Sequence, residues 1–170
     1  KKRSAARNRI EYLAVRLTLG LLRRLPMGAA QWAGWRLIAA LAGRSRKLRN
    51  TLHRNLEIAF PQMQAEDRDR IAEGVYRELG RSLAVFARFP DLDRSNIIAY
   101  PVEGVEHYEK AKREGRGVLF ATAHLGNWEL SAYAHALMAE PMHVVVRPLD
   151  NPLLDRFVEQ RRTGSGNRVI

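Results

Sequence analysis

The alternation of short apolar runs with helical segments after residue 95 is the feature that most constrains how this chain can fold. The expected strands occupy residues 96–102, 117–122, 143–147 and 168–170, and the expected helices between them occupy residues 106–113, 128–139 and 151–162. Alternation of this kind is typical of right-handed crossovers between parallel strands. We therefore predict an α/β fold with a mostly parallel sheet and flanking helices, and we expect the sheet to be truncated at the C-terminus.

The preceding part of the chain has a purely helical period. Apolar side chains recur every three or four positions over residues 8–25, 28–42, 48–59 and 65–89. We predict that the stripe in the last of these segments faces the core. The chain is therefore expected to comprise a basic, membrane-associating helical region at residues 1–94 and the incomplete beginning of an α/β core at residues 95–170.

The positive charge is concentrated near the N-terminus. Residues 1–60 contain 14 Lys and Arg against two acidic residues, whereas residues 61–170 contain 15 against 16. A basic surface of this kind can face nucleic acid, anionic lipid or an acidic carrier protein. The candidate cations for lipid phosphates are Arg23, Arg24, Arg44, Arg46, Lys47 and Arg49.

The first two predicted helices are poor candidates for membrane spans. Each is shorter than the roughly 20 uninterrupted apolar residues required, and they contain Arg16 and Arg36 respectively. They are suited to lie in the membrane interface with Trp32 and Trp35 at headgroup depth. The alternative is that both helices pack on the protein's own core.

The strand-to-helix turn at residues 121–130, with the sequence ATAHLGNWEL, is the best candidate for chemistry. His124 follows an expected buried strand, at the sheet edge where α/β proteins bind ligands. Asn127 is suited to cap the next helix, and Glu129 falls in its first turn. An imidazole held by a carboxylate can act as a general base toward a hydroxyl group. The alternative is that His124 packs locally and Glu129 only favours the helix start.

Asn127 and three arginines are candidates for substrate binding. Arg147 ends an expected strand at the same sheet edge as His124, and the following helix could direct Arg161 or Arg162 toward the crevice. The planar guanidinium suits phosphate or carboxylate groups. A salt bridge or a loop hydrogen bond is the alternative for Arg147.

Other site chemistries find no support in the sequence. The absence of cysteine excludes a thiol nucleophile and a cysteine zinc site. His53, His107, His135 and His143 have no metal-binding spacing, and neither a dinucleotide fingerprint nor a phosphate-binding lysine loop is present. We expect no metal and no cofactor.

Three blocks of sequence, in order, resemble one family. The His-and-acid arrangement in residues 123–129 resembles the signature of the lysophospholipid acyltransferase superfamily, and more narrowly its bacterial lipid A biosynthesis late acyltransferase branch, the lauroyl and myristoyl transferases. Arg46-Lys47, Asn55-Leu56 and Phe60-Pro61 resemble that branch's upstream segment, and residues 147–153, RPLDNPL, resemble the segment after the catalytic loop.

The resemblance implies an O-acyltransferase. The donor would be the thioester of an acyl carrier protein or of coenzyme A, used as a co-substrate, and the acceptor would be a lipid A precursor. The family arginine that follows the Asn-Pro segment maps best to Arg162, with Arg161 beside it. Family members are longer, so we expect this chain alone to be inactive.

The implied location is the cytoplasmic face of the bacterial inner membrane, on an anionic membrane surface, as a peripheral or monotopic protein. One alternative is acyl transfer to a lysophospholipid or another glycolipid. Another is a non-catalytic basic module that binds membrane or nucleic acid. We expect no nucleic-acid partner, because the tryptophans lie within apolar helical faces and are not interleaved with the basic residues.

Overall fold

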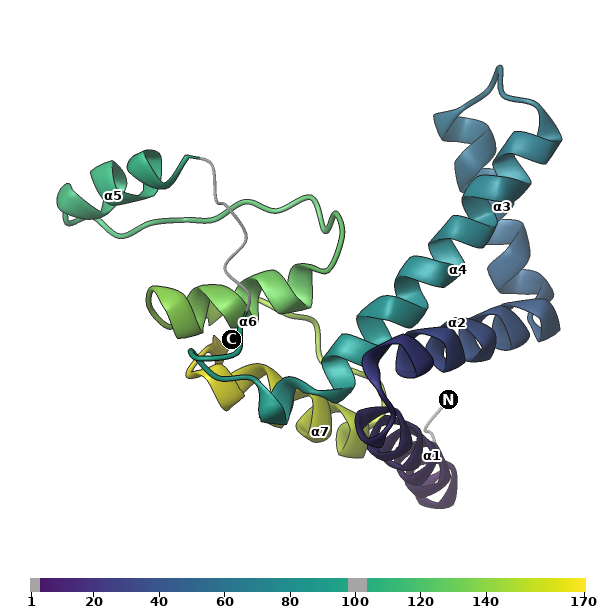
Figure 1. Ribbon diagram of the computed structural model, residues 1–170, viewed down its shortest axis with the longest axis horizontal. Coiled ribbons are helices and arrows are strands. Elements are labelled where there is room, and N and C mark those ends of the chain that lie inside the picture. Colours follow the sequence, from purple (N-terminus) through teal and green to yellow (C-terminus); the bar gives the residue numbers. More distant parts are fainter. Residues whose placement is uncertain (1–3, 98–103) are drawn as a thin grey trace.

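The computed structural model describes residues 4–97 and 104–170. Four helices come first and follow one another through short turns (Figure 1): α1 (Ala5–Arg24), α2 (Met27–Arg44), α3 (Arg46–Ala59) and α4 (Ala65–Ala87). A short 3-10 helix, η1 (Phe89–Asp91), continues α4. The four helices predicted from the apolar period are confirmed, with ends shifted by a few residues.

The core of this region depends on small residues that let α2 and α4 approach closely. A Cβ atom added at Gly34 would lie 2.6 Å from the carbonyl oxygen of Gly80, so neither position has room for a side chain. Leu19 and Leu22 of α1 pack against the same seam. Of the apolar stripe predicted for residues 65–89, Phe89 is buried and Leu83 and Phe86 pack against the core, whereas Leu79 is 51% exposed. The prediction is therefore confirmed at the C-terminal end of the stripe and wrong at Leu79, and the buried residues of α4 itself are small ones such as Ala84 and Ala87.

The tryptophans of α2 have different environments. Trp32 is exposed, whereas the indole N–H of Trp35 donates to Glu73 at 2.7 Å and the Arg77 guanidinium lies 5.1 Å from its ring centre. Trp35 therefore packs between α2 and α4 and does not share a free face with Trp32. No helix in the described parts of the chain is long and apolar enough to cross a membrane.

The second half combines helices with a small parallel sheet. Its helices are α5 (Val105–Arg113), α6 (Trp128–Met138), α7 (Pro152–Arg162) and the 3-10 helix η2 (Thr163–Ser165). Strand β1 (His143–Val144) pairs in parallel with β2 (Arg168–Val169), with His143 opposite Arg168. The fold is thus α/β and mostly helical, and the three predicted helices and the last two predicted strands are confirmed in these places.

The strand predicted at residues 117–122 is wrong. This segment is extended but has no strand as a partner among the described residues, and the side chain of Leu119 is fully exposed. A β-strand forms only where a neighbouring strand provides partners for its backbone hydrogen bonds, and an apolar sequence does not by itself provide that neighbour. For the strand predicted at residues 96–102, Asn96 and Ile97 lie in a turn that follows Asp93, and the remainder lies outside the described residues.

Two buried asparagines join the sheet and α7 to the helices. Asn151 caps α7, as predicted, by accepting from the N–H of Leu153 at 3.1 Å, and its amide donates to the Asn8 carbonyl of α1 at 2.9 Å. Asn167 accepts from the N–H of Met142 at 2.8 Å, and its amide donates to a carbonyl of α6 at 2.9 Å. Both side chains are satisfied, so their burial is compatible with stability.

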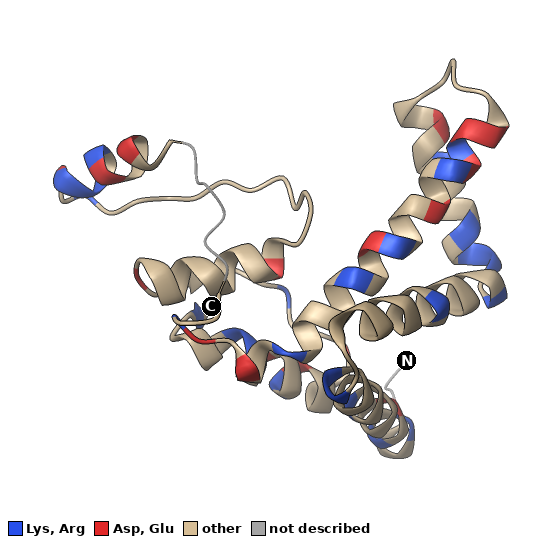
Figure 2. Ribbon diagram, viewed as in Figure 1, with Lys and Arg blue, Asp and Glu red and all other residues tan. Residues whose placement is uncertain are grey.

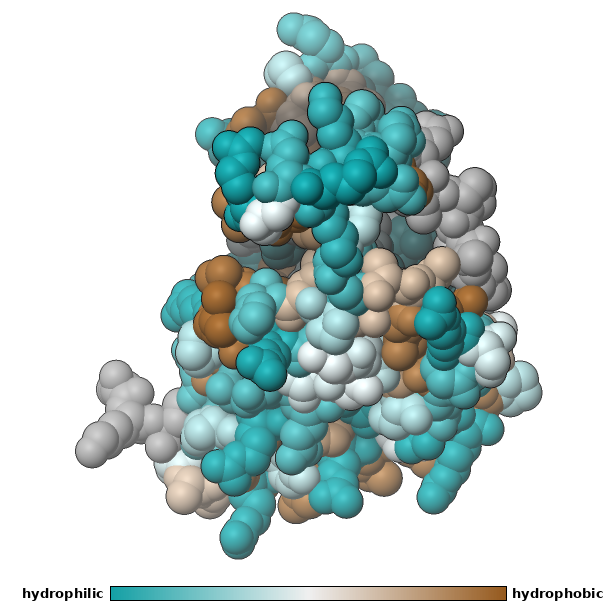
Figure 3. Space-filling view, turned by 90° about the vertical axis from the view of Figure 1, so that its left-hand side faces the viewer, coloured by the Kyte–Doolittle hydropathy of each residue, from teal (hydrophilic) through white to brown (hydrophobic). Residues whose placement is uncertain are grey.

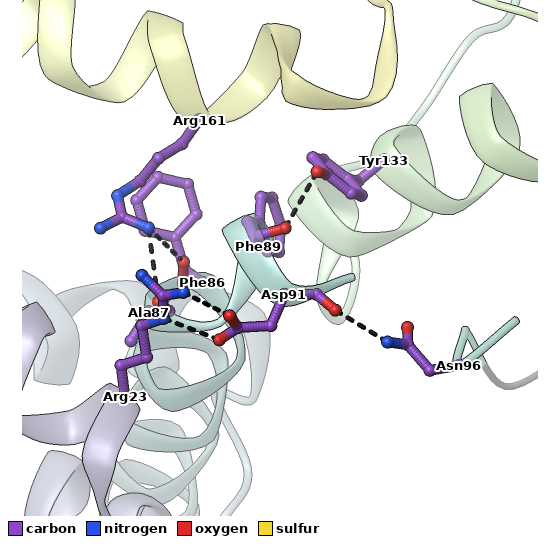
Figure 4. Close-up of polar contacts among 8 residues, drawn as sticks. All are labelled: Arg23, Phe86, Ala87, Phe89, Asp91, Asn96, Tyr133 and Arg161. Atoms are coloured by element: carbon purple, nitrogen blue, oxygen red, sulfur yellow. Dashed lines mark hydrogen bonds and ion pairs between the residues drawn. The ribbon is translucent and has the colours of Figure 1, made fainter. Parts of the chain in front are cut away.

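The C-terminal end of α4 is where α6 and α7 attach, as Figure 4 shows. The Arg161 guanidinium of α7 donates to the carbonyls of Phe86 and Ala87 at 3.5 and 3.4 Å. The Tyr133 hydroxyl of α6 donates to the Phe89 carbonyl at 2.9 Å. A cation is favourable at a helix C-terminus, where the last carbonyls lack helical partners. Arg161 therefore has a structural role at the end of α4.

An ion pair links α1 to the same junction. The Arg23 guanidinium contacts Asp91 through two nitrogens, with Nε to Oδ2 at 2.7 Å. The hydrogen bond from Arg23 holds the pKa of Asp91 below its usual value. Burial lowers the pKa of Arg161, and the nearby Arg23 charge lowers it further. Arg23 is therefore engaged within the protein and is not a free cation for lipid.

Candidate active site

The loop that leads into α6 places His124 in an unusual backbone conformation. His124 has φ = +54°, in the left-handed region that residues other than glycine seldom adopt, and Gly126 has φ = +67°. The His124 backbone N–H donates to the Thr122 hydroxyl at 3.3 Å. Asn127 then caps α6, as predicted, by accepting from the Leu130 N–H at 3.1 Å. The imidazole is exposed at the surface immediately before the helix start.

Glu129 is held by Arg162. Arg162 Nε lies 3.1 and 3.0 Å from the two carboxylate oxygens of Glu129, and Nη2 also contacts the carboxylate. Both side chains are about one-fifth exposed, at 20% and 19%. Partly buried pairs of this two-nitrogen type are stronger and better oriented than exposed ion pairs. α7 therefore reaches across to the first turn of α6 and fixes the Glu129 carboxylate.

The structure shows which of the two adjacent arginines faces the candidate site, a question that the sequence left open. Arg162 faces Glu129, whereas Arg161 faces the end of α4. Of the two, only Arg162 is placed to influence groups around His124.

Trp128 completes the cluster, and sequence reasoning did not single it out. Its indole packs against the His124 imidazole with ring centres 4.7 Å apart and an angle of 38° between the planes. The Arg162 guanidinium lies 5.6 Å from the same indole ring. The signal available in the sequence was its position between His124 and Glu129, since the first residue of a capped helix lies beside the loop that precedes it.

The hydrogen bond expected between His124 and Glu129 is not among those that the described residues make. His124 contacts Trp128, and Glu129 is occupied by Arg162. A carboxylate has about four lone-pair positions, and an arginine fork uses two of them. Glu129 therefore retains acceptor capacity for an imidazole N–H while Arg162 is bound.

Arg147 lies apart from this cluster. Its side chain is 90% exposed, and Nη2 lies 3.8 Å from Asp150 Oδ1. It borders an open cavity of about 660 Å³ between α1 and α7, whose lining includes Glu11, Asn151 and Leu154. The structure does not bring Arg147 into contact with His124 or Glu129, and the local ion pair was the alternative reading of this residue.

Metal binding finds no support in the parts of the chain that the structure describes. No group of three His, Asp or Glu side chains there is arranged to hold a metal ion.

Comparisons with known proteins give one consistent result. The family model for bacterial lipid A biosynthesis acyltransferase matches residues 1–170. The lipid A biosynthesis palmitoleoyltransferase of Escherichia coli K12 is 31% identical over 157 residues, covering 89% of this chain and 50% of that protein. The lipid A biosynthesis lauroyltransferase of the same organism is 32% identical over 163 residues, covering 94% and 49%.

A more distant lipid A biosynthesis acyltransferase, from Haemophilus influenzae, is 25% identical over 120 residues. No solved structure gives a significant match. The chain spans about half the length of the curated relatives it matches.

Proposed function

This chain belongs to the bacterial lipid A biosynthesis acyltransferase family, and from that premise we propose that the full-length protein is an acyltransferase. It would transfer a fatty acyl chain from a thioester donor to a hydroxyl group of a lipid A precursor or related glycolipid. The donor would be an acyl carrier protein or coenzyme A thioester. The names of the relatives at 31% and 32% identity support the reaction class. The thioester is a co-substrate, and the proposed reaction requires no cofactor.

The observation that carries the proposal is the cluster at the start of α6. His124 and Glu129 flank Trp128, and Arg162 fixes the Glu129 carboxylate. In the proposed reaction His124 removes the proton of the acceptor hydroxyl as its oxygen attacks the thioester carbonyl. The carbon–sulfur bond then breaks, and the imidazolium returns the proton to the leaving thiolate.

Glu129 would act through His124. It would accept the second imidazole N–H and stabilise the imidazolium, using the acceptor capacity that the Arg162 fork leaves free. Reaching that geometry requires the His124 ring to turn toward Glu129 while it remains against the Trp128 indole. Its exposed position in a loop permits such a rotation.

Substitution of the pair in the full-length protein tests this mechanism. We expect His124→Ala and Glu129→Gln to lower acyl transfer by about two to four orders of magnitude, the usual scale for loss of general-base catalysis. His143→Ala is a matched control, because His143 is an exposed histidine on β1, outside the cluster. Near-normal transfer by either site variant would remove that residue from the mechanism.

Arg147 is proposed as a contact for an anionic group of the acceptor, since its exposed guanidinium borders the cavity between α1 and α7. If it binds the acceptor without entering the chemistry, Arg147→Ala raises KM and leaves kcat unchanged. A fall in kcat at unchanged KM would contradict this role.

Asn127 is proposed only as the cap that fixes the loop, because its side-chain oxygen accepts the hydrogen bond from the Leu130 N–H.

Membrane attachment is proposed to involve α1 and to place the protein on the cytoplasmic face of the inner membrane. One side of α1 packs on the core through Leu19 and Leu22, and another side leaves four aliphatic side chains 53–68% exposed: Ile10, Leu13, Leu17 and Leu21. These positions recur every three or four residues and so form one stripe. Full burial of such a side chain contributes about 1.5–3 kcal/mol, so these half-exposed ones have roughly 1 kcal/mol each to gain from a lipid interface.

The face on the side of α5 and α6 is mostly hydrophilic, with hydrophobic side chains in separate patches (Figure 3). Figure 2 shows basic residues on α1 and α3 and also on α4, α5 and α7. Among the basic residues near the N-terminus, Arg24, Arg44, Arg46 and Lys47 are exposed. Arg49 is less available because its guanidinium donates to the carbonyls of Ala42 and Gly43.

Vesicle sedimentation tests the membrane proposal. We expect binding to favour anionic over neutral vesicles and to weaken with salt, and we expect Leu17→Glu to reduce binding at every salt concentration. Leu79→Glu is the matched control, because Leu79 is a similarly exposed leucine on α4, outside the stripe. Equal loss of binding in both variants would show that the α1 stripe has no special role.

A further inference from the structure

We propose that Trp128 is a positioning residue of the active site, whose indole ring packs against the His124 imidazole and restricts its rotation, next to the helix turn in which Arg162 fixes the Glu129 carboxylate. This inference rests on the proposed function, because it assigns Trp128 a role in acyl transfer. The proposal adds a third residue to the site, because the sequence pattern contains only the histidine and the acid, His124 and Glu129.

The need for such a residue follows from the exposure of the loop. His124 lies in a turn with positive φ, its side chain is exposed, and its neighbour Leu125 is 88% exposed. Its backbone N–H is held by Thr122, but that hydrogen bond leaves the rotation of the ring unrestricted. Among the described residues, the ring that packs against the imidazole is the indole of Trp128.

Trp128 is itself well fixed. It is the first residue of α6, directly after the Asn127 cap, so its backbone is held at the helix start. Its ring also lies 5.6 Å from the Arg162 guanidinium, which is in turn bound to Glu129. The indole thus contacts both the proposed base and the cation that orients the proposed carboxylate.

The expected size of the effect follows from the ring contact. An aromatic pair of this kind shifts a local equilibrium by about three- to tenfold beyond simple burial. If His124 reacts while its ring is packed on the indole, removing the indole lowers kcat by up to that factor. Acceptor KM stays unchanged, because Trp128 would act through His124 and not by binding substrate.

The kinetic test compares two substitutions in the full-length protein. Trp128→Phe keeps an aromatic ring against His124 and is expected to retain most of the kcat, whereas Trp128→Leu keeps apolar bulk without a ring and is expected to lose up to about tenfold. A role in general packing would not distinguish the two variants in this way. Full kcat in Trp128→Leu would overturn the proposal.

A spectroscopic test examines the contact without reference to activity. A protonated imidazole quenches the fluorescence of an indole that it touches, so part of the emission should fall when the pH is lowered far enough to protonate imidazole side chains. That part should be present in the wild-type chain and absent from both Trp128→Phe and His124→Gln. Its absence from the wild type would show that the rings are not in contact and would also overturn the proposal.

These outcomes are separable from failure of the proposed function. If His124→Ala retains normal transfer, the general-base mechanism fails, whatever Trp128 does. If His124→Ala is inactive and Trp128→Leu is fully active, the mechanism stands and only the positioning role fails.

Discussion

The close contact of α2 with α4 makes a quantitative prediction for Gly80→Ala. An added Cβ at Gly80 would lie 2.7 Å from the carbonyl carbon of Gly34 and closer still to the backbone of Trp35. These are main-chain atoms of a packed helix, so the helices would have to separate by about 1 Å, and overpacking of this kind costs about 1–3 kcal/mol. Alanine regains about 1 kcal/mol through its higher helix propensity. The net expectation is a loss of about 0–2 kcal/mol, toward the upper end because rigid backbone yields less readily than side chains.

Gly74→Ala provides the matched control in the same helix. A Cβ at Gly74 meets no atom within 4 Å, so alanine there should stabilise the chain by about 0.5–1 kcal/mol. Thermal unfolding followed by circular dichroism measures both variants, and 1 kcal/mol corresponds to about 2–4 °C for a chain of this size. Gly80→Ala should melt below the wild type and Gly74→Ala above it. Equal stabilisation by both would refute the close approach of the two helices.

Two other substitutions test buried polar groups. The His135 Nε2 atom is buried without a hydrogen-bond partner among the described residues, and burial lowers the pKa of this imidazole. The folded state therefore disfavours protonation of His135 and loses stability as pH falls below about 6.5. The thermal unfolding midpoint should decline less between pH 7 and pH 5 in His135→Phe than in the wild type. An equal decline in both would contradict this role of His135. Asn167→Ala leaves the Met142 N–H and the Ala132 carbonyl unpaired and should cost about 1–3 kcal/mol in urea unfolding. Asn50→Ala, an exposed control on α3, should change little, and equal effects would contradict the bridging role of Asn167.

The sequence predicted the helices and their caps because those features are local. A helical stripe records its own period over many residues, and a capping side chain bonds to N–H groups two or three positions away. Asn127 and Asn151 both cap as predicted. The strands at residues 143–147 and 168–170 were also predicted, although the structure forms them over fewer residues.

The errors concern partners that the sequence does not specify. The apolar run at residues 117–122 has the composition of a strand, but its ladder hydrogen bonds require a neighbour that local composition cannot identify. Arg161 and Arg162 are consecutive on α7 and point about 100° apart, so a small rotation of the helix decides which one meets Glu129. That pairing joins residues 33 positions apart, and the packing of α7 against the end of α4 sets it.

The central claim is tested most directly by mass spectrometry of a lipid A precursor incubated with the full-length protein and an acyl thioester. We expect the precursor to gain the mass of one acyl chain, attached through an ester, when the wild-type protein is used, and to remain unmodified with His124→Ala. A product that His124→Ala forms as fast as the wild type, or no product with either an acyl carrier protein or a coenzyme A donor, would contradict the account.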